Sequence, residues 1–501
     1  MDHVSSCKTE ATKQESTATA ANSVDAKGVL TQNTLLALLQ KQRDSFMHDG
    51  FPNSEIRQDR VMRIADIHRT YADKICEALN EDFKGRSTSL TQMSDIGSVV
   101  MDAKDTIKHI SKWMKPRRRK SPFPLELFGA KAQILYQPLG VIGNISPWNF
   151  PMVLAFGPAI GALAAGNRML IKPSELTPCT SELMKEMVES AFDETELAVV
   201  NGGVEVGKAF SALPFDHLVY TGGPTIAKYV MKSAAENLVP LTLELGGKCP
   251  VIISDTADLK MATDRIISAK AVNSGQLCLS PDYILISENR IEEFLSEAQS
   301  VLKRFYGDSL LNNKDYTSVI NRQHWIRLKS YIDEAKKAGC RVKSFNPLQE
   351  DFSSADRHRL PITFFVNPDD NLKAMQEEFF GPLLSIKPMN DIQHAINYVN
   401  ARPRPLALYY FGNSKTEMDR IKKETTSGGM TINDVAMHAS CPDLPLSGVG
   451  NSGMGAYHGQ DGFREFSHAK AIYKQAVFSP SKLLQPPYGK AKKKIIESIA
   501  N

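Results

Sequence analysis

The stretch "HLVYTGGPTIAKYVMKSAAENLVPLTLELGG", residues 217–247, decides the fold class of this chain. Two short apolar runs of strand length stand at its beginning and end, and a segment of helical character separates them. Strands that alternate with helices of this length form β-α-β units, in which the two strands are parallel. The stretch therefore predicts part of a parallel, doubly wound α/β sheet, where ligands bind at the carboxyl ends of the strands.

The same alternation continues on both sides of this stretch. Four strand-like runs precede it, and a second cycle of strands and helices follows Gly247. We therefore expect two doubly wound α/β domains. The further runs are "QILYQP" (133–138), "GVIGNIS" (140–146), "RMLIKPS" (168–174), "ELAVVNG" (196–202), "CPVIIS" (249–254) and "YILIS" (283–287).

The flanking segments predict helices and an N-terminal arm. Apolar residues recur at helical spacing from Gln32 to Phe83, which predicts long amphipathic helices. The apolar run of residues 150–166 is too short to cross a membrane and contains Pro158, so we expect a buried helix. The basic run Lys115–Lys120 could bind nucleic acid or an anionic membrane, but a solvated helix end before an extended segment is commoner. Residues 1–28 predict a disordered or loosely attached arm.

Composition points to a globular protein that acts on small molecules. The 501 residues are 42% hydrophobic and 23% charged, which suits two or three domains. A net charge of +4, from 60 basic and 56 acidic side chains, is too near balance to favour nucleic acid as the main partner. Seven scattered cysteines without CxxC pairs argue against a disulfide framework and against a metal site, and indicate a reduced, cytoplasmic setting.

Three side chains have sequence surroundings that suit catalysis. Cys278, within "NSGQLCLSPDY", could be a nucleophile or only a small buried side chain. Glu244, at a predicted strand end in "LELGGKCP", could be a general base with a raised pKa or an ordinary ion-paired glutamate. Asn149 of "SPWNFP" could donate its amide to a developing oxyanion or satisfy its own turn. These residues considered one at a time leave the alternatives open.

Two further motifs suit a nucleotide, although a GxGxxG fingerprint is missing. In "YTGGPTIAK" a predicted strand leads through Gly222 and Gly223 into a helix, so backbone N–H groups could face a pyrophosphate. The alternative is glycine used for turn geometry alone. Lys172 and Glu175 follow another strand and could bind ribose hydroxyls, or could be surface charges beside a turn.

Taken together and in order, seven motifs resemble the aldehyde dehydrogenase superfamily over about residues 30–487. They are "SPWNFP", "GNRMLIKPSE", "YTGGPTIAK", "LELGGKCP", "NSGQLCLSPDY", "EEFFGP" and "LPLSGVGNSGMGAYHG". Within the superfamily, "VGNSGMGAYHG", "FREFSHAKAIYKQ" and "LLQPPYGK" look like the class 3 branch. The segment "WMKPRRRKSPFPLELFGAKAQILYQPLGVIGNISPWNFP" looks most like the bacterial coniferyl aldehyde dehydrogenases of that branch.

The resemblance implies a role for each matching residue, and it implies no metal. The catalytic residues would be Cys278 as the nucleophile, Glu244 as the base and Asn149 as the oxyanion donor. The cofactor would be held by Trp148, by Lys172 and Glu175 at the adenosine ribose, by Gly222 and Gly223 at the pyrophosphate, by Glu378 at the nicotinamide ribose and by Phe380 beside the nicotinamide ring.

The implied cofactor is NAD, with NADP as an alternative. Glu175 favours NAD because its negative charge would repel a 2′-phosphate. The phosphate turn departs from the common family pattern, since Gly223 replaces a serine, Pro224 a threonine and Ala227 a glycine. A missing N–H at Pro224 and an added methyl at Ala227 are expected to affect the affinity and pose of the cofactor.

The expected reaction is NAD(P)-dependent oxidation of an aromatic or hydrophobic aldehyde, such as coniferaldehyde, to the carboxylic acid through a cysteine thiohemiacetal and thioester. A medium- or long-chain fatty aldehyde is the alternative substrate. A thiol hydrolase or acyltransferase that needs no cofactor is the alternative from another enzyme class. The expected partners are a small-molecule aldehyde and further copies of the chain, in a homodimer or homotetramer, without nucleic acid and without an integral membrane segment.

The resemblance also implies a division into domains. It consists of an arm (1–28), a cofactor-binding domain (29–120 and 137–246, with part of 436–466), a catalytic domain (247–435), a small β oligomerisation element (121–136 and 467–487) and a basic tail (488–501).

Overall fold

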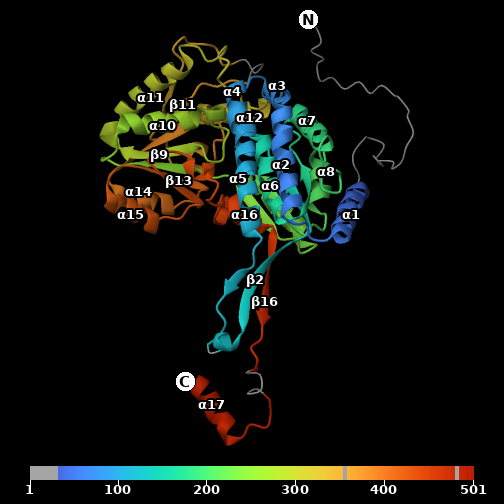
Figure 1. The fold of residues 1–501 in the computed structure, drawn as a ribbon. Helices are drawn as coiled ribbons and strands as arrows, with labels where there is room; N and C mark the ends of the chain where they lie inside the picture. The colour runs from blue at the N-terminus through green and yellow to red at the C-terminus, as the bar shows by residue number, and fades with distance from the viewer. Residues whose placement is uncertain (1–31, 124, 354–357, 480–484, 501) are drawn as a thin grey trace, which may run out of the picture.

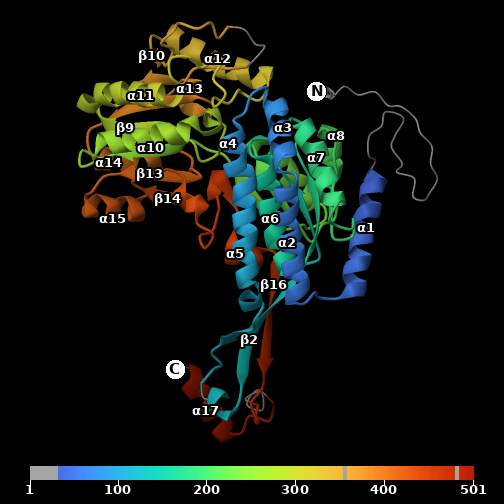
Figure 2. The ribbon, with the colours of Figure 1, turned by 45° about the horizontal axis from the view of Figure 1, so that its top comes forward.

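A computed structural model describes residues 32–123, 125–353, 358–479 and 485–500. Three β-sheets, of six, seven and three strands, organise these residues (Figures 1 and 2). The two larger sheets carry helices on their faces and lie next to each other, whereas the three-stranded sheet projects away from both. The expected α/β class with two doubly wound sheets is confirmed. The N-terminal arm expected at residues 1–28 lies outside the described residues.

The six-stranded sheet is parallel except at one edge, where the short strand β15 runs antiparallel to β7. Its central strands are almost completely buried, as expected for a parallel sheet covered on both faces. The strands, in spatial order, are β15 (Gly453–Met454), β7 (Leu241–Leu245), β6 (His217–Gly222), β3 (Val141–Ile145), β4 (Arg168–Lys172) and β5 (Leu197–Val199).

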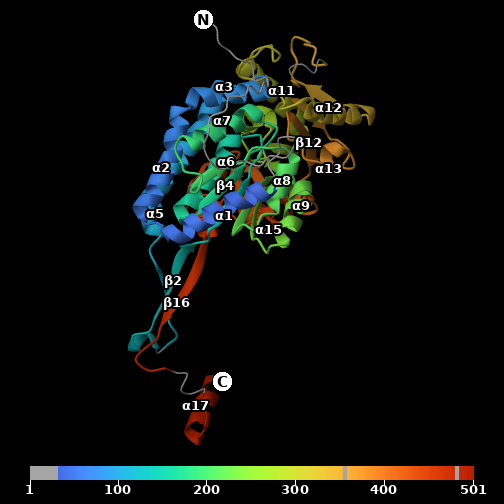
Figure 3. The same cartoon turned by 90° about the vertical axis from the view of Figure 1, so that its right-hand side faces the viewer.

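Helices cover both faces of this sheet, as Figure 3 shows from the side. One face carries α2 (Ser54–Thr70), α3 (Ala72–Phe83), α4 (Thr88–Thr91), the π-helical turn η1 (Gln92–Gly97), α5 (Ser98–Trp113), α6 (Pro151–Ala165), α7 (Pro178–Glu189) and α16 (Gly459–Glu465). The other face carries α1 (Gln32–Asp49), α8 (Val204–Ser211) and α9 (Pro224–Ala235).

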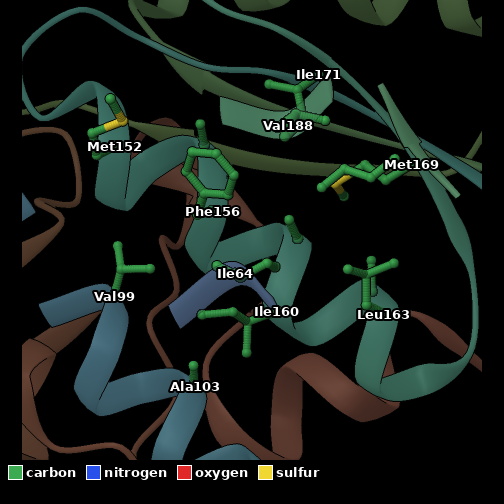
Figure 4. Close-up of a cluster of buried hydrophobic side chains, with 14 of the residues drawn as sticks. Ile64, Val99, Ala103, Met152, Phe156, Ile160, Leu163, Met169, Ile171 and Val188 are labelled. Carbon is green, nitrogen blue, oxygen red and sulfur yellow. The ribbon is translucent and has the colours of Figure 1, made fainter. Parts of the chain in front are cut away.

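Helix α6 is the apolar run that the sequence predicted to be a buried helix, and this prediction is confirmed. It lies between the sheet and the outer helices: Phe156 points toward Ile171 of the sheet, and Ile160 lies near Ile64 and Ala103 of the outer helices (Figure 4). Pro151 lies in its first turn, where the N–H group that a proline lacks would have no partner inside the helix. Gly166 ends the helix in the left-handed conformation, with φ 96°. The position of α6 is therefore fixed by burial on all sides, and its N-terminus directly follows the "SPWN" turn.

The seven-stranded sheet is also parallel except at one edge, between β10 and β11. Its strands, in spatial order, are β10 (Arg341–Ser344), β11 (Thr363–Val366), β12 (Leu383–Met389), β9 (Pro281–Ser287), β8 (Cys249–Ile253), β13 (Ala407–Phe411) and β14 (Gly429–Ile432). Its helices are α10 (Leu259–Ala271), α11 (Ile291–Tyr306), α12 (Arg322–Lys337), α13 (Lys373–Gln376), α14 (Ile392–Asn400) and α15 (Lys415–Glu424). Short turns of 3-10 helix are η3 (Val272–Gly275), η4 (Glu288–Arg290), η5 (Met437–Ser440) and η6 (Gly450–Ser452).

The three-stranded sheet, here named the β-extension, is antiparallel, with β2 (Lys131–Pro138) between β1 (Arg117–Arg119) and β16 (Ser467–Lys474). A 3-10 turn, η2 (Leu125–Phe128), lies at its far end. The basic run was predicted to be a solvated helix end, and its arginines are exposed as expected, but α5 ends at Trp113 and Arg117–Arg119 form the strand β1. The reason is that β1 pairs with the backbone of β2, which a single-sequence pattern does not show.

The last described element is α17 (Lys490–Ala500), which follows the β-extension and contains the lysines of the basic tail. Figure 1 shows this helix beyond the end of the β-extension, away from the two larger sheets. Across the described parts of the chain, none of the helices is both long and apolar enough to cross a membrane.

Candidate active site

The predicted site residues come together where the carboxyl ends of the six-stranded sheet face the start of β9. Asn149 follows β3, Lys172 ends β4, Gly222 ends β6 and Glu244 lies in β7. These parallel neighbours present their carboxyl ends at the same edge of the sheet. Cys278 lies on the opposite side, in the loop between α10 and β9. The site is therefore formed between the two large sheets.

The loop that carries Cys278 has an unusual backbone. Asn273, Ser274 and Gly275 are left-handed in succession, with φ of 50°, 51° and 71°. A Cβ atom on Gly275 would lie 2.3 Å from the carbonyl oxygen of Gly381, so no side chain fits there. Residues with side chains cost free energy in this conformation, and such strain persists only where the surroundings hold it in place.

Gln276 supplies part of that support. Its side-chain amide donates to the carbonyl oxygens of Asn273 (2.9 Å) and Ser318 (3.0 Å), and its side-chain oxygen accepts from the backbone N–H of Ile320 (2.9 Å). The thiol of Cys249 donates to the carbonyl oxygen of Cys278 over 3.3 Å. The polar residues of this loop thus brace the backbone that presents the Cys278 thiol.

The electrostatic surroundings of Cys278 keep its thiol protonated in the absence of a positive charge. Burial, with the nearby carboxyl groups of Glu378 and Glu244, raises the pKa of this thiol to about 12. A thiol is a weak nucleophile until it loses its proton. The site therefore needs a base, a nearby cation or both to activate Cys278.

Glu244 is placed to be that base. Its side chain is 4% exposed, and neither carboxyl oxygen has a hydrogen-bond partner within the described portion of the chain. Burial, with a smaller effect of Glu465, raises the pKa of Glu244 to about 8. A buried carboxyl group without partners is costly, and such groups are found preferentially at functional sites. The burial and the raised pKa of Glu244 agree with the expected general base.

Asn149 is held on both sides by hydrogen bonds. Its side-chain amide donates to the carbonyl oxygen of Gln276 over 3.2 Å, two residues before Cys278. Its own carbonyl oxygen accepts from Arg86 over 2.8 Å and from the side-chain amide of Asn273 over 3.0 Å. The amide is thus directed at the backbone of the loop that carries Cys278, where an oxyanion donor would be required if Cys278 is the predicted nucleophile.

A cavity of about 240 Å³ joins most of the predicted residues. Eight of the ten residues named from the sequence line it, and Lys172 and Glu175 do not. The lining residues are Pro147, Trp148, Asn149, Leu154, Gly222, Gly223, Glu244, Leu245, Gly246, Cys278, His324, Arg327, Glu378 and Phe380.

The turn at Gly222 and Gly223 has the geometry of an anion site despite its altered sequence. Gly223 is the N-cap of α9, and a Cβ atom built on it meets no atom within 4 Å. Pro224 takes the first helical position, where the lost N–H would have no partner inside the helix. Ala227 is packed in the apolar cluster beneath α9 and is 1% exposed. The following N–H groups of the first turn remain available to a phosphate.

Lys172 and Glu175 form an ion pair with each other over 2.9 Å. Lys172 is buried, whereas the Glu175 side chain is 42% exposed. Glu175 also acts on Tyr220, whose pKa is raised chiefly by burial and further by this carboxylate. Tyr220 in turn donates to the carbonyl oxygen of Gly223 over 3.3 Å. The pair therefore lies beside the phosphate turn, at the same edge of the sheet.

The "EEFF" segment enters the cavity from the second sheet. Burial and the nearby Asp282 raise the pKa of Glu378 to about 8. Phe380 is left-handed with φ 47°, and its ring lies 5.3 Å from that of Trp148 in an edge-to-face arrangement. Arg327 donates to the carbonyl oxygens of Glu378 (3.2 Å) and Phe379 (2.7 Å), so it stabilises the turn that precedes Phe380.

Sequence reasoning missed several residues of this site. His324 and Arg327, one helical turn apart on α12, both line the cavity, and the His324 ring lies 5.2 Å from that of Trp148. Their i, i+3 spacing puts both on one face of the helix, but it does not say which face meets a cavity. Arg86 was also missed, because nothing in its sequence surroundings connects it to Asn149.

The arrangement suits NAD(P) on several independent grounds. The open space at Gly223 and the N-terminal N–H groups of α9 suit a pyrophosphate. Glu244, whose carboxyl oxygens have no hydrogen-bond partner among the described residues, lines a cavity that Cys278 also lines. A cluster of three or more metal-binding side chains is not found within the described residues. The residues present therefore fit a dinucleotide beside a thiol.

Comparison with known proteins agrees with this geometry. The model of the aldehyde dehydrogenase family matches residues 51–472. A probable coniferyl aldehyde dehydrogenase of Caulobacter vibrioides is 48% identical over 462 residues, which cover 92% of this chain and 95% of that protein. The coniferyl aldehyde dehydrogenase of a Pseudomonas species is 46% identical over 90% of this chain and 93% of its own.

The fold agrees with solved structures as well. The substrate-bound state of Staphylococcus aureus AldH superposes with a TM-score of 0.86 at 33% identity, over 93% of this chain and 99% of that chain. The seven motifs, the two doubly wound sheets and the placement of a thiol between them had pointed to the same family. This chain belongs to the aldehyde dehydrogenase family and is an oxidoreductase that acts on aldehydes.

Proposed function

We propose that this enzyme oxidises an aromatic or otherwise hydrophobic aldehyde, with coniferaldehyde as the leading candidate, to the carboxylic acid with NAD. The observation that carries the proposed chemistry is that Cys278, Asn149 and Glu244, from three separate elements, line one cavity beside the phosphate turn. The substrate class is supported by two relatives, 48% and 46% identical, that carry the name coniferyl aldehyde dehydrogenase.

In the first step the sulfur of Cys278 forms a bond to the aldehyde carbon. The thiol proton passes to the carboxylate of Glu244, and the carbonyl electron pair moves to oxygen. The Asn149 amide and a backbone N–H near Cys278 stabilise the resulting oxyanion. The raised pKa of the thiol supports a role for Glu244 in this step, because Cys278 alone would stay protonated near neutral pH.

NAD, when bound, would supply an acceptor for the hydride of the aldehyde carbon, and the positive charge of its ring would lower the pKa of the neighbouring thiol. Trp148, Glu378 and Phe380 would hold the nicotinamide half against Cys278, and the α9 N-terminus would hold the pyrophosphate. Lys172 and Glu175 would bind the adenosine ribose. The exposed Glu175 carboxylate would repel a 2′-phosphate, which supports NAD over NADP.

Hydrolysis of the Cys278 thioester completes the reaction. Once the proton taken from the thiol has passed to solvent, the Glu244 carboxylate takes a proton from water, the water oxygen attacks the acyl carbon, and the sulfur departs as a thiolate while the acid is released. A carboxyl group with a pKa of about 8 accepts this proton more readily than one with an ordinary pKa. Glu244 is therefore the proton acceptor in both steps.

We propose that the β-extension joins subunits in a homodimer or homotetramer. Five large apolar side chains are exposed around its far end: Phe123, Leu127, Phe128, Val477 and Phe478. An apolar patch of this kind usually meets a partner, and the free edges of the sheet can pair with strands of another chain. Light scattering coupled to size-exclusion chromatography tests this, and a monomer at micromolar concentration would contradict it.

We also propose a cytoplasmic location and the division of labour that the resemblance implies. None of the six cysteines in the described part of the chain forms a disulfide, which suits a reducing compartment. The cofactor would bind the domain formed by 29–120, 137–246 and part of 436–466, and the nucleophile would come from 247–435. The segments 121–136 and 467–487 would contribute to oligomerisation.

The decisive experiment is an activity panel with purified enzyme. We expect coniferaldehyde and related aromatic aldehydes to give higher kcat/KM with NAD than medium- or long-chain alkanals, and we expect NADP to be the poorer cofactor. A preference for long alkanals would replace the substrate by a fatty aldehyde. Ester turnover without any aldehyde-dependent reduction of NAD would favour a thiol hydrolase or acyltransferase instead.

A further inference from the structure

Arg86 and Asp95 form an ion pair that is completely removed from solvent. The distance from Arg86 Nη2 to Asp95 Oδ2 is 2.5 Å, and both side chains are 0% exposed. Burying two charges costs several kcal/mol of hydration free energy per ion in general, and apolar residues of similar size are often more stabilising. A pair in this setting is therefore weak support for stability alone and calls for another explanation.

The contacts of Arg86 lead to the proposed oxyanion donor. Its Nη1 donates to the carbonyl oxygen of Asn149 over 2.8 Å, while its Nη2 holds Asp95. The guanidinium also lies 4.9 Å from the ring centres of Phe83 and Phe150. Arg86 is thus fixed by aromatic contacts and by a carboxylate, and its Nη1 donates to the turn that carries Asn149, whereas its Nε has no hydrogen-bond partner among the described residues.

The acidic partner is itself held at the same turn. The hydroxyl of Ser94 donates to Asp95 Oδ2 over 2.8 Å. Burial raises the pKa of Asp95, and Arg86, Ser94 and the backbone N–H of Met152 counteract that effect. Met152 lies in the first turn of α6, three residues after Asn149, so Asp95 also lies close to the turn that contains Asn149.

The local backbone explains how Asp95 reaches this position. Residues Gln92–Gly97 form a π-helical turn between α4 and α5, and Asp95 lies within it. Such turns insert an extra residue into a helix, change which side chain faces inward, and occur frequently at functional sites. The turn therefore helps to direct a carboxylate into the protein interior, next to Arg86.

Asn149 shares its hydrogen bonds between this pair and the nucleophile loop. Its carbonyl oxygen accepts from both Arg86 and Asn273. Asn273 also donates to the carbonyl oxygen of Gln276, which accepts from the Asn149 amide as well. A shift of the Asn149 backbone would consequently move its amide relative to the loop of Cys278.

We propose that Arg86, oriented by Asp95, is a positioning residue that sets the Asn149 amide for the oxyanion formed at Cys278. This inference rests on the proposed function, in which Asn149 donates to that oxyanion. In this role the buried pair affects the rate of the chemical step, and it does so without contacting the substrate or the cofactor.

Arg57 offers a matched control at the opposite end of α6. Its side chain is also buried, at 3% exposed, and donates to the carbonyl oxygens of Ala164 (3.2 Å) and Ala165 (2.6 Å). It therefore supports the same helix through the same kind of bond, far along the helix from Asn149. Substitution of either arginine would destabilise α6, whereas only substitution of Arg86 would displace Asn149.

The test is a double-mutant cycle between Arg86 and Asn149, read by hydrolysis of p-nitrophenyl acetate without cofactor and by single-turnover oxidation with NAD. We expect Arg86→Lys to lower both rates by about 10- to 100-fold in the otherwise native enzyme, because small displacements of a catalytic group have effects of this size. In the Asn149→Ala background the same substitution should change them by less than about twofold, since coupled sites are non-additive. The Kd of Arg86→Lys for NAD should stay within about twofold of the native value, and so should both rates of Arg57→Lys.

The outcomes separate this inference from the function on which it rests. Native rates in Asn149→Ala would overturn the oxyanion assignment and the positioning role with it. A slow Asn149→Ala enzyme in which Arg86→Lys is equally damaging in both backgrounds would overturn the positioning role alone. Equal rate losses in Arg57→Lys and Arg86→Lys would do the same. If Arg86→Lys does not fold, the charge-neutral pair Arg86→Met with Asp95→Asn enters the cycle in its place.

Discussion

Gly246 lies directly against the carboxyl group of Glu378: a Cβ atom on this glycine would be 2.0 Å from Glu378 Oε2. This close approach connects the end of β7 in the first sheet with the "EEFF" segment of the second. The glycine therefore sets how near the proposed ribose-binding carboxyl group comes to the strand that carries Glu244.

We expect Gly246→Ala to weaken cofactor binding, because the added methyl must displace Glu378 or the strand at a cost of about 1–3 kcal/mol. The measurement is the KM for NAD together with its Kd by fluorescence titration, and both should rise about tenfold or more. Gly157→Ala is the control, since its Cβ would meet Tyr457 at an ordinary 3.8 Å within α6. An unchanged KM in Gly246→Ala would contradict the placement of Glu378 at the cofactor.

Alkylation of Cys278 should be slow at neutral pH in the free enzyme. Its thiol pKa of about 12 leaves little thiolate, so the rate with iodoacetamide should rise about tenfold per pH unit between pH 7 and 9. Adding NAD should accelerate the reaction at pH 7, because a positive charge nearby favours the thiolate. Mass spectrometry identifies the modified cysteine and separates it from the exposed Cys441. Rapid alkylation at pH 7 without NAD would show that the free thiol is already ionised.

Cys278→Ala should abolish aldehyde oxidation, whereas Glu244→Gln should chiefly slow hydrolysis of the thioester. Glu244 accepts a proton only as a carboxylate, and with a pKa of about 8 about one molecule in ten carries it at pH 7. Hydrolysis of p-nitrophenyl acetate by the free enzyme should therefore show an inflection near pH 8, and Glu244→Gln should be slower and lack that inflection. Aldehyde-dependent reduction of NAD by Cys278→Ala at the native rate would end the assignment.

His68 should make the protein less stable in acid. Burial lowers its pKa to about 4 from an ordinary 6.5, so below pH 6.5 the unfolded chain binds a proton that the folded chain excludes. The free energy of unfolding should then fall between about pH 6.5 and 4, by up to about 1.4 kcal/mol per pH unit for this residue. The free energy of unfolding, measured with urea at each pH, should depend less steeply on pH in His68→Gln than in the exposed control His468→Gln. Equal slopes would show that His68 is already protonated in the folded protein.

Much of the fold was predictable from local patterns. Apolar runs of strand length separated by helical segments are sufficient for parallel sheets, because strands buried on both faces must be apolar along their whole length. The exception at β1 has the same physical basis, since an arginine-rich segment becomes a strand through pairing with β2, and that partner is not visible in its own sequence. The ten site residues were identified by resemblance, and the residues considered singly left each role open.

The sequence by itself determined the two α/β sheets, the order of the motifs and the residue types available for chemistry. Only the tertiary structure decided which of these side chains meet and what their pKa values are, because burial and charged neighbours are properties of the folded chain. Arg86 contacts Asn149 across 63 positions, and His324 and Arg327 reach the cavity from the second sheet. Such contacts depend on how helices and sheets pack, and no short stretch of sequence encodes them.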